Sequence, residues 1–181
     1  QTLDWFFKKG KHDFEEMTNL PPALRKKLKE EYRVDVPVVE SFKSKDGTIK
    51  FRFDIDAKRA IEAVWMPEET RSTLCISSQV GCALKCAFCV TGAFGLDRNL
   101  KAHEIVMQVW YVKSLMKLAL TNVVFMGMSE PLHNDEQVIR SIDVLIQPKG
   151  MAIGKRKITV STVGVVPKIA NFIEKTDVKL A

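Results

Sequence analysis

The most constraining feature of the sequence is the regular alternation of short apolar segments with longer amphipathic ones from Thr73 to the C-terminus. The apolar segments have the length of strands, and the amphipathic ones repeat apolar residues at helical spacing. Strands that alternate with helices form right-handed βαβ units around a parallel sheet, so the pattern predicts an α/β fold. We expect strands at Leu74–Ser78, Asn122–Met126, Lys157–Ser161 and from Val178, and helices at about Ala102–Leu118, Asp135–Ile146 and Pro167–Lys175.

Three polar segments follow the predicted parallel strands. A cysteine-rich loop at 81–89 follows the first strand, Gly127–Pro131 follows the second, and Ser161 ends the third. Active sites of such folds lie at the carboxyl ends of the strands, so we expect these segments to meet at one end of the sheet. A Gly-x-x-Glu-Pro turn or a serine that ends a strand is, by itself, more often a plain turn or cap.

The loop holds three of the four cysteines, Cys82, Cys86 and Cys89, at a C-x3-C-x2-C spacing. Thiolates are the soft ligands that select iron–sulfur clusters or zinc. Three ligands on a cluster of four irons would leave one iron open for chemistry. The spacing therefore favours an iron–sulfur cluster.

Zinc is the competing interpretation of this loop. Structural zinc sites have four ligands, usually as two close pairs, and only Cys75 could complete a tetrahedron here. Cys75 lies upstream without a paired cysteine, and no histidine follows at zinc-finger spacing. A disulfide framework is disfavoured because the chain shows no signal peptide.

The loop resembles the signature of radical S-adenosylmethionine (SAM) enzymes, C-x3-C-x-aromatic-C, with Phe88 as the aromatic residue. The longer run from Thr73 to Val109 is similar to the bacterial methyltransferases that modify C2 of adenine in large-subunit ribosomal RNA and in tRNA. The resemblance covers nearly the whole chain and implies a partial (β/α) radical-SAM barrel. It also implies a [4Fe-4S] cluster on Cys82, Cys86 and Cys89, with SAM as the second cofactor.

The same resemblance assigns roles to further residues of the expected barrel. It implies that Phe88, Ser129, Glu130 and Ser161 bind the cofactor, with Glu130 accepting from the ammonium group of SAM. The family usually has glycine at the position of Ser129. If that glycine serves a positive φ, Ser129 would be strained, whereas a contact through the backbone carbonyl would tolerate serine.

Two residues on the predicted strands have ordinary interpretations by pattern and catalytic ones by resemblance. Glu62, on a predicted strand at Ala60–Met66, reads as a solvent-facing carboxylate, but it matches the family's proton acceptor. Cys75 reads as a buried small apolar residue. By resemblance it resolves a covalent protein–RNA intermediate by attacking the sulfur of a second, methyl-carrying cysteine, which lies in a C-terminal part that this chain does not supply.

The residues before Thr73 divide into two parts. Apolar residues at helical spacing, with breaks at Gly10 and Pro21-Pro22, predict a helical segment, which resembles the family's accessory domain. Asp46-Gly47 predicts a hairpin turn between strands at Val38–Ser44 and Ile49–Asp54. We expect a helical accessory domain at 1–36, a hairpin and strand connector at 37–70, and the N-terminal half of the barrel at 71–181, truncated at its fourth strand.

The composition of the chain bears on its cellular compartment and on the kind of partner that it binds. No apolar run is long enough to cross a membrane, and the N-terminus lacks signal-peptide order, so we expect a cytoplasmic protein without a membrane partner. The net charge of +6 is compatible with a polyanionic partner. The resemblance implies ribosomal RNA and tRNA as partners, an electron donor such as flavodoxin, and a monomer.

Two alternatives to an adenine-C2 methyltransferase follow from the sequence. The sister enzyme methylates C8 of the same ribosomal adenine and confers antibiotic resistance; Cys89–Gly92 and Gly95-Leu96 lean towards it, while Val80, Ala83-Leu84 and Arg98–Leu100 lean towards the C2 enzyme. A noncatalytic, zinc-stabilised RNA-binding module is the alternative from another class. Because the chain stops inside an expected strand, we expect a fragment that is inactive by itself.

Overall fold

The computed structural model describes residues 1–181 and is built on a seven-stranded mixed sheet with the order β1-β2-β3-β4-β7-β8-β9. The first four strands pair antiparallel, and β4, β7, β8 and β9 pair parallel. This confirms the predicted α/β class. The strands of this sheet are β1 Val38–Lys43, β2 Ile49–Asp54, β3 Ala60–Pro67, β4 Ser72–Cys75, β7 Asn122–Phe125, β8 Ile158–Val160 and β9 Lys179–Leu180.

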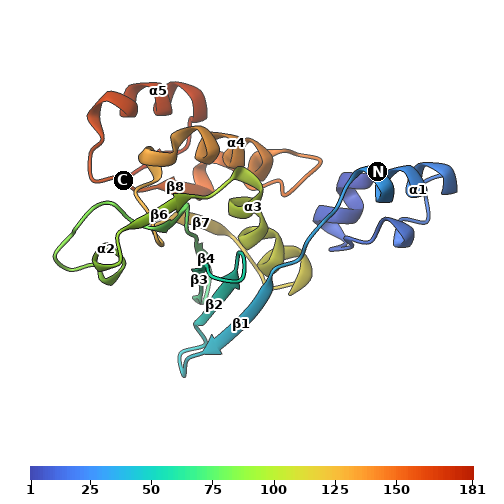
Figure 1. Ribbon diagram of the computed structural model, residues 1–181, viewed down its shortest axis with the longest axis horizontal. Coiled ribbons are helices and arrows are strands. Elements are labelled where there is room, and N and C mark those ends of the chain that lie inside the picture. Colours follow the sequence, from blue (N-terminus) through green and yellow to red (C-terminus); the bar gives the residue numbers. More distant parts are fainter.

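Three helices follow the parallel strands in the order that the sequence predicts. They are α3 Ala102–Trp110, α4 Asp135–Ile146 and α5 Val166–Thr176, and Figure 1 shows them side by side. The helix predicted at Ala102–Leu118 is α-helical only to Trp110 and continues as a π-helical turn, η3, over Tyr111–Leu115. Lys117 then takes a positive φ of 57°, which ends the helical segment.

The hydrophobic core lies between these helices and one face of the sheet. Alternate residues of the strands point into it, as the period of two in a strand requires. They meet the apolar sides of α3, α4 and α5. The fully buried core residues include Phe51, Phe53, Ile61, Leu74, Val123, Phe125, Ile158 and Val160 from the strands, and Ile105, Val109, Trp110, Val138, Ile142, Leu145 and Phe172 from the helices.

The other face of the sheet, called the open face below, carries the remaining strand residues. Residues paired directly across neighbouring strands point to the same side of a sheet. The pairings align Lys50 on β2, Val64 on β3, Cys75 on β4, Val124 on β7 and Thr159 on β8 in one row. None of these five residues is fully buried, so the open face is accessible where Cys75 lies.

The β1–β2 hairpin and β3 continue the sheet from β4. The turn forms at the predicted Asp46-Gly47, where Gly47 has a φ of +87° and the Thr48 amide donates to the Asp46 carboxylate at 3.0 Å. Pairing of β3 with β4 makes the segment at 37–70 an extension of the barrel sheet. The expected boundary between the connector (37–70) and the barrel (71–181) therefore falls within one continuous hydrogen-bonded sheet.

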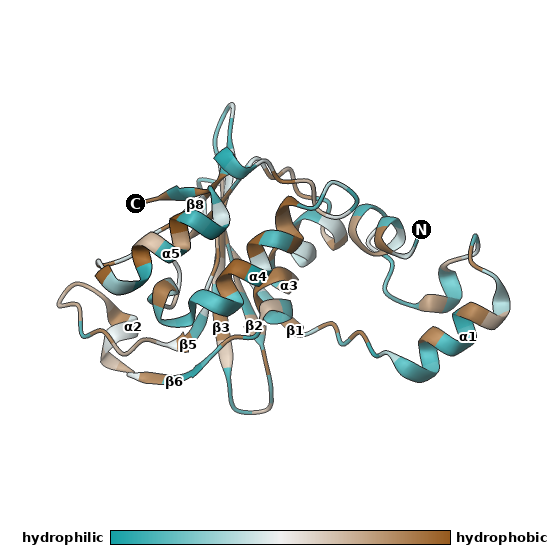
Figure 2. Cartoon of the chain, turned by 90° about the horizontal axis from the view of Figure 1, so that it is seen from above, coloured by the Kyte–Doolittle hydropathy of each residue, from teal (hydrophilic) through white to brown (hydrophobic).

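The N-terminal residues form short helical segments: η1 Asp4–Lys8, η2 Phe14–Glu16 and α1 Pro22–Glu31. Figures 1 and 2 both show α1, which is largely hydrophilic, set apart from the sheet. By contrast, η1 contacts the end of α3, where the Phe6 ring stacks on Trp110 at 4.8 Å between centroids. The Trp110 indole also donates to the Phe6 carbonyl at 2.7 Å.

A separate two-stranded ribbon, β5 Gln79–Gly81 with β6 Leu96–Asn99, was not expected from the sequence. The first parallel strand was predicted at Leu74–Ser78, but β4 ends at Cys75 and the chain then turns into this ribbon. A short helix, α2 Val90–Ala93, lies between the two ribbon strands. None of the helices has the length and apolar character that crossing a membrane requires.

Candidate functional site

The cysteine-rich loop is closed at its base by the β5–β6 ribbon. The Cys82 amide, directly after β5, donates to the carbonyl of Gly95, directly before β6, at 2.9 Å. Within the loop, the Leu84 amide donates to the Cys82 sulfur at 3.4 Å, which fixes the first turn after β5. Cys82 is buried, Cys86 and Cys89 are partly exposed, and all three are free thiols.

Two glycines allow this loop to close. A Cβ atom on Gly81, whose φ is +77°, would lie 2.0 Å from the Gly95 carbonyl oxygen. A Cβ atom on Gly92 would lie 2.6 Å from the Leu84 carbonyl oxygen. Both contacts are with backbone, which cannot turn aside as a side chain can. The conformation of the loop therefore depends on glycine at both positions.

The donor set of the loop fits an iron–sulfur cluster. Cys82, Cys86 and Cys89 offer three soft sulfur donors, two of them accessible from solvent. The structure does not arrange three or more His, Cys, Asp or Glu side chains around one point, neither in the loop nor with Cys75. Convergence of the three sulfurs would therefore accompany binding, as is common when ligand binding and local folding are coupled.

Phe88 lies on the outside of this loop. Its side chain is 92% exposed, so the predicted cofactor contact is not supported by any neighbouring residue in the structure. Val90 and Phe94, which follow on the same loop, are 75% and 77% exposed. The segment thus presents three large apolar side chains to solvent.

Glu130, after β7, is the most constrained of the predicted cofactor ligands. It is only 1% exposed, and its carboxylate accepts from the Leu132 amide at 2.9 Å, the Thr162 hydroxyl at 2.8 Å and the Val163 amide at 2.9 Å. A carboxylate offers about four acceptor sites, so these donors leave about one for a further partner. Binding of an ammonium group by Glu130 stays a prediction.

Ser129 and Ser161 lie beside Glu130 at the ends of β7 and β8. Ser129 is not among the residues with positive φ, so serine is unstrained where the family usually has glycine. Its hydroxyl is buried and has no hydrogen-bond partner. Ser161 is partly exposed, and the neighbouring Thr162 contacts Glu130. The structure thus brings three of the predicted cofactor residues together at the expected end of the sheet.

The polar residues Ser77 and Gln79, which are not among the predicted site residues, support this site. The Ser77 hydroxyl donates to the Glu62 carbonyl at 2.7 Å and accepts from the Met128 amide at 2.9 Å. The Gln79 side chain accepts from the Glu130 amide at 2.9 Å. Both residues are fully buried. A run of polar residues immediately after a buried strand was the signal that could have identified them.

Cys75 and Glu62 both lie on the open face. Cys75 pairs with Val64, two residues beyond Glu62 on β3, and burial raises the pKa of the Cys75 thiol. Glu62 is exposed, and its carboxylate forms an ion pair with Lys50 at 3.0 Å. The sheet therefore places a protonated thiol and an accessible carboxylate on the same side of neighbouring strands.

Two family profiles match the chain. The profile described as "Radical SAM superfamily" matches residues 76–180, which include the cysteine loop and all the parallel strands after it. The profile described as "Ribosomal RNA large subunit methyltransferase N-terminal domain" matches residues 1–34, the N-terminal helical part. The two matches together account for most of the chain.

Curated relatives and a solved structure agree with these profiles. A protein of Francisella tularensis subsp. novicida (strain U112), named "Dual-specificity RNA methyltransferase RlmN", is 46% identical over 189 residues, covering 100% of this chain and 51% of that protein. A protein of the same name from subsp. holarctica (strain OSU18) is 44% identical with the same coverage. The chain therefore spans about half the length of the curated relatives it matches.

One similar solved structure is a radical SAM methyltransferase from Sphaerobacter thermophilus. It is 39% identical, with a TM-score of 0.90, and the match covers 99% of this chain and 54% of that one. This confirms the expected fold, a partial radical-SAM barrel with the sheet extension and the N-terminal helices. With the superfamily profile matching more than half of its residues, the chain belongs to the radical SAM superfamily.

Proposed function

We propose that the protein containing this chain is a radical SAM RNA methyltransferase of the RlmN type. It methylates C2 of an adenine in 23S ribosomal RNA. It also methylates an adenine next to the anticodon of tRNA. The observation that carries the proposal is the closed loop with three free cysteines at the carboxyl end of the parallel strands, in a chain similar to RlmN over its whole length. The protein works in the cytoplasm, as a monomer, with an electron donor such as flavodoxin.

The residues that would hold the cofactors are those at the strand ends. Cys82, Cys86 and Cys89 would hold a [4Fe-4S] cluster, and SAM would lie against Ser129, Glu130 and Ser161. Together the two cofactors of this superfamily supply a carbon-centred radical. Such chemistry suits C2 of adenine, because this carbon is electrophilic and its C–H bond is not acidic, so ordinary methyl transfer cannot use it.

Cys75 and Glu62 would act on the RNA from the open face. A thiol attacks as the thiolate, and burial keeps Cys75 protonated at neutral pH, so it needs a base before it can release the product. Glu62 is exposed on the same face, where its carboxylate is accessible and is positioned by the ion pair with Lys50, so it would serve as the proton acceptor. The thiol partner of Cys75 in this release would come from the remainder of the longer protein.

The test of the proposal is anaerobic reconstitution of the chain with iron and sulfide, followed by low-temperature EPR after reduction. We expect a [4Fe-4S] signal that changes when SAM is added. A Cys86→Ala variant should lose the signal, whereas Cys75→Ser, which leaves the loop intact, should keep it. Stoichiometric zinc without any cluster in folded protein would contradict the proposal and support the RNA-binding module.

The position of methylation has its own test. Mass spectrometry of adenosines from the 23S RNA of cells that express the longer protein would separate C2 from C8 methylation. We expect the C2 product, and its loss in a Cys75→Ala variant. Methylation at C8 alone would assign the protein to the sister enzyme, with the same cluster chemistry.

A further inference from the structure

A cavity of about 670 Å³ lies between the N-terminal helical turn η1 and the helices α3 and α4. Its floor is apolar, and polar side chains stand at its rim. Its volume lies within the range of small-ligand sites, about 300–1,000 Å³. This groove, as we call it below, is lined by Phe6, Phe7, Lys101, Ala102, His103, Val106, Met107, Trp110, Gln137, Arg140 and Val144.

The charged rim of the groove is entirely basic. Lys101 and Arg140 are exposed, and no carboxylate lines the groove. Two acidic residues on the same helices are paired elsewhere: Glu104 with Arg98 at 2.8 Å, and Asp135 with Lys168 at 2.6 Å. Glu136 and Asp143, one turn before and after Arg140 on α4, do not line the groove. The rim therefore complements an anionic ligand.

The apolar side of the groove is an aromatic platform that is held in place. Phe6 lies parallel to the buried Trp110 ring, with an interplanar angle of 9°. Phe7 meets Phe6 edge to face, with centroids 4.9 Å apart. The Ser114 hydroxyl donates to the Phe7 carbonyl and thereby fixes the backbone. Phe6 and Phe7 are partly exposed, and pre-ordered rings of this kind are suited to stacking with an unpaired base.

The groove opens at the same end of the molecule as the candidate site. Lys101 comes directly after the segment that leaves β6, and it begins α3. Gln137, near the start of α4, accepts a hydrogen bond from the Ala102 amide at 3.0 Å, so the first turns of the two helices are joined at the rim. Since helices begin at the carboxyl ends of the preceding strands, the groove starts beside the site and runs towards η1.

We propose that this groove binds an unpaired segment of the substrate RNA, with its phosphates on Lys101 and Arg140 and a base against Phe6 and Phe7. The groove lies outside the sheet, so the nucleotide bound there is a different one from the adenine that is methylated. This proposal rests on the proposed function, which supplies RNA as the partner. It identifies where the RNA is held outside the sheet.

The first test is fluorescence anisotropy of the chain with a labelled single-stranded RNA of about 16 nucleotides, the upper end of usual site sizes. A Lys101→Gln/Arg140→Gln variant should bind about tenfold more weakly, and the slope of log affinity against log salt should fall by about 1.4, for two phosphate contacts. The matched control, Lys149→Gln/Lys175→Gln, loses the same charge at exposed positions that do not line the groove. It should bind within about twofold of the parent.

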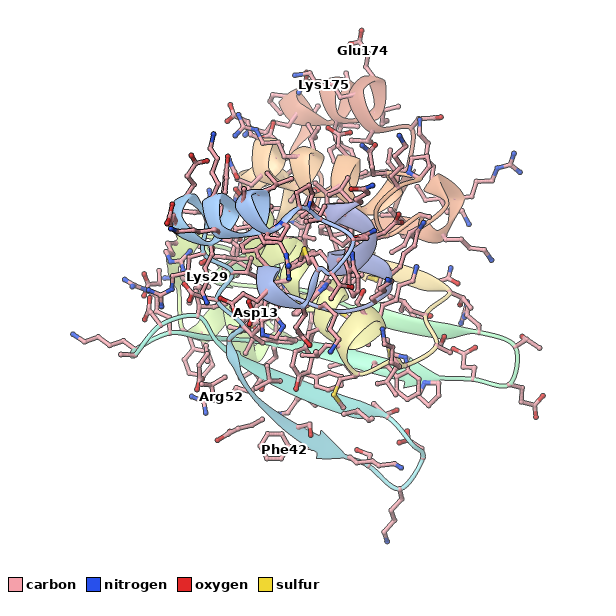
Figure 3. All side chains as sticks on the ribbon, turned by 90° about the vertical axis from the view of Figure 1, so that its right-hand side faces the viewer. Asp13, Lys29, Phe42, Arg52, Glu174 and Lys175 are labelled. Carbon is pink, nitrogen blue, oxygen red and sulfur yellow. The ribbon has the colours of Figure 1, made fainter.

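Figure 3 shows Lys175 at the outer end of α5, and Lys175 does not line the groove. Phe7→Leu removes the ring but keeps an apolar side chain, and it should weaken RNA binding about fivefold. An RNA with 4-thiouridine should crosslink, on irradiation, to peptides that contain Phe6, Phe7 or Met107. Circular dichroism of each variant checks that it is folded.

Three results would overturn the proposal. They are equal RNA affinity of the groove variant and the control, crosslinks confined to peptides outside the groove, and displacement of the RNA by AMP at comparable concentrations, which would indicate a free-nucleotide site. If the parent chain binds no RNA but gives a normal EPR signal, the proposal that the groove binds RNA is rejected and the proposed function is not. Loss of the cluster signal in the parent chain would instead reject the proposed function.

Discussion

The buried carboxylate of Glu130 accepts a hydrogen bond from the Thr162 hydroxyl at 2.8 Å, which joins the turn after β7 to the turn after β8. The Thr162 hydroxyl in turn accepts from the Gly164 amide at 3.1 Å. Glu130 is thus both a candidate cofactor ligand and a structural link between two strand ends. Substitutions of Thr162 test the structural role of Glu130 without removing its carboxylate.

Thr162→Val should lower the thermal stability of the chain. The substitution removes a donor to a buried carboxylate, which costs about 1.5–3 kcal/mol for a hydrogen bond to a charged group. For a chain of this size each kcal/mol shifts the Tm by about 2–4 °C. Thermal unfolding followed by circular dichroism measures the shift. Thr162→Ser keeps the hydroxyl and should melt close to the parent; equal melting of Thr162→Val would show that the link is dispensable.

Gly92→Ala should reduce iron binding while the rest of the chain stays folded. The new methyl group would meet the Leu84 carbonyl oxygen at 2.6 Å and force the cysteine loop open. Gly154→Ala is the matched control, because its Cβ would have ordinary contacts at 4.0 Å and no strained φ. Iron content per chain after anaerobic reconstitution is the measurement. A Gly92→Ala variant that takes up iron as fully as Gly154→Ala would disprove the dependence.

The burial of Cys75 predicts a pH dependence of stability. Burial raises the pKa of this thiol in the folded state, whereas the unfolded chain has an ordinary value of about 8.5. The protonated thiol's contribution to the free energy of unfolding is fully present below about pH 8.5. It is lost as the pH rises towards the folded-state pKa, because only the unfolded chain then releases the proton. Urea unfolding of the parent and of Cys75→Ala from pH 7 to pH 10 should show a steeper decline in the parent. If the unfolding free energies of the two proteins changed with pH in parallel, the predicted contribution of Cys75 would be contradicted.

The same burial should slow alkylation of Cys75 by iodoacetamide. In a variant with serine at Cys82, Cys86 and Cys89, the rate at pH 7 should lie well below that of a free thiol and should rise with pH above the ordinary pKa range. Mass spectrometry of the labelled peptide gives the rate. A rate equal to that of a small thiol would show that burial neither shields Cys75 nor raises its pKa.

Phe6→Ala should release the N-terminal segment from α3. The substitution removes the ring that stacks on Trp110, and it uncovers the indole. Large-to-small changes of packed aromatic residues cost about 3–5 kcal/mol when fully buried, and Phe6 is only half-buried, so a smaller cost is expected. Limited proteolysis should cut the first 36 residues faster than in the parent. Trp5→Ala removes a ring of the same helical turn and its hydrogen bond to Asn19 but keeps the Phe6–Trp110 stack, so it should be cut more slowly than Phe6→Ala.

The elements with strong, local patterns could be predicted from the sequence. The helix at Asp135–Ile146 has its predicted bounds, because acidic residues begin it and apolar residues recur at helical spacing. The hairpin at Asp46-Gly47 also followed from local turn chemistry. By contrast, β5 and β6 are short and partly polar, and only their pairing with each other makes them strands. That pairing depends on the close approach of Gly81 to Gly95, which no local pattern reveals.

The candidate site could be predicted in part. The cysteine spacing identified the loop, and the rule for strand ends brought Ser129, Glu130 and Ser161 together correctly. The supporting contacts of Ser77 and Gln79 could not be predicted, because their partners lie about fifty residues away in the sequence. The continuous pairing of β3 with β4 was equally hidden, since strand order in a sheet is decided by tertiary contacts.

The contact of Phe6 with Trp110 has a consequence for how the protein is made. The hydrogen bond from the Trp110 indole joins residues 104 positions apart, so η1 leaves the ribosome long before its docking partner exists. At about 5–20 residues per second, the two phenylalanines wait for roughly 5–20 s. During that interval the apolar residues of η1 are exposed on the nascent chain. Chaperones that bind early-emerging aromatic residues therefore have a defined period in which to act on this protein.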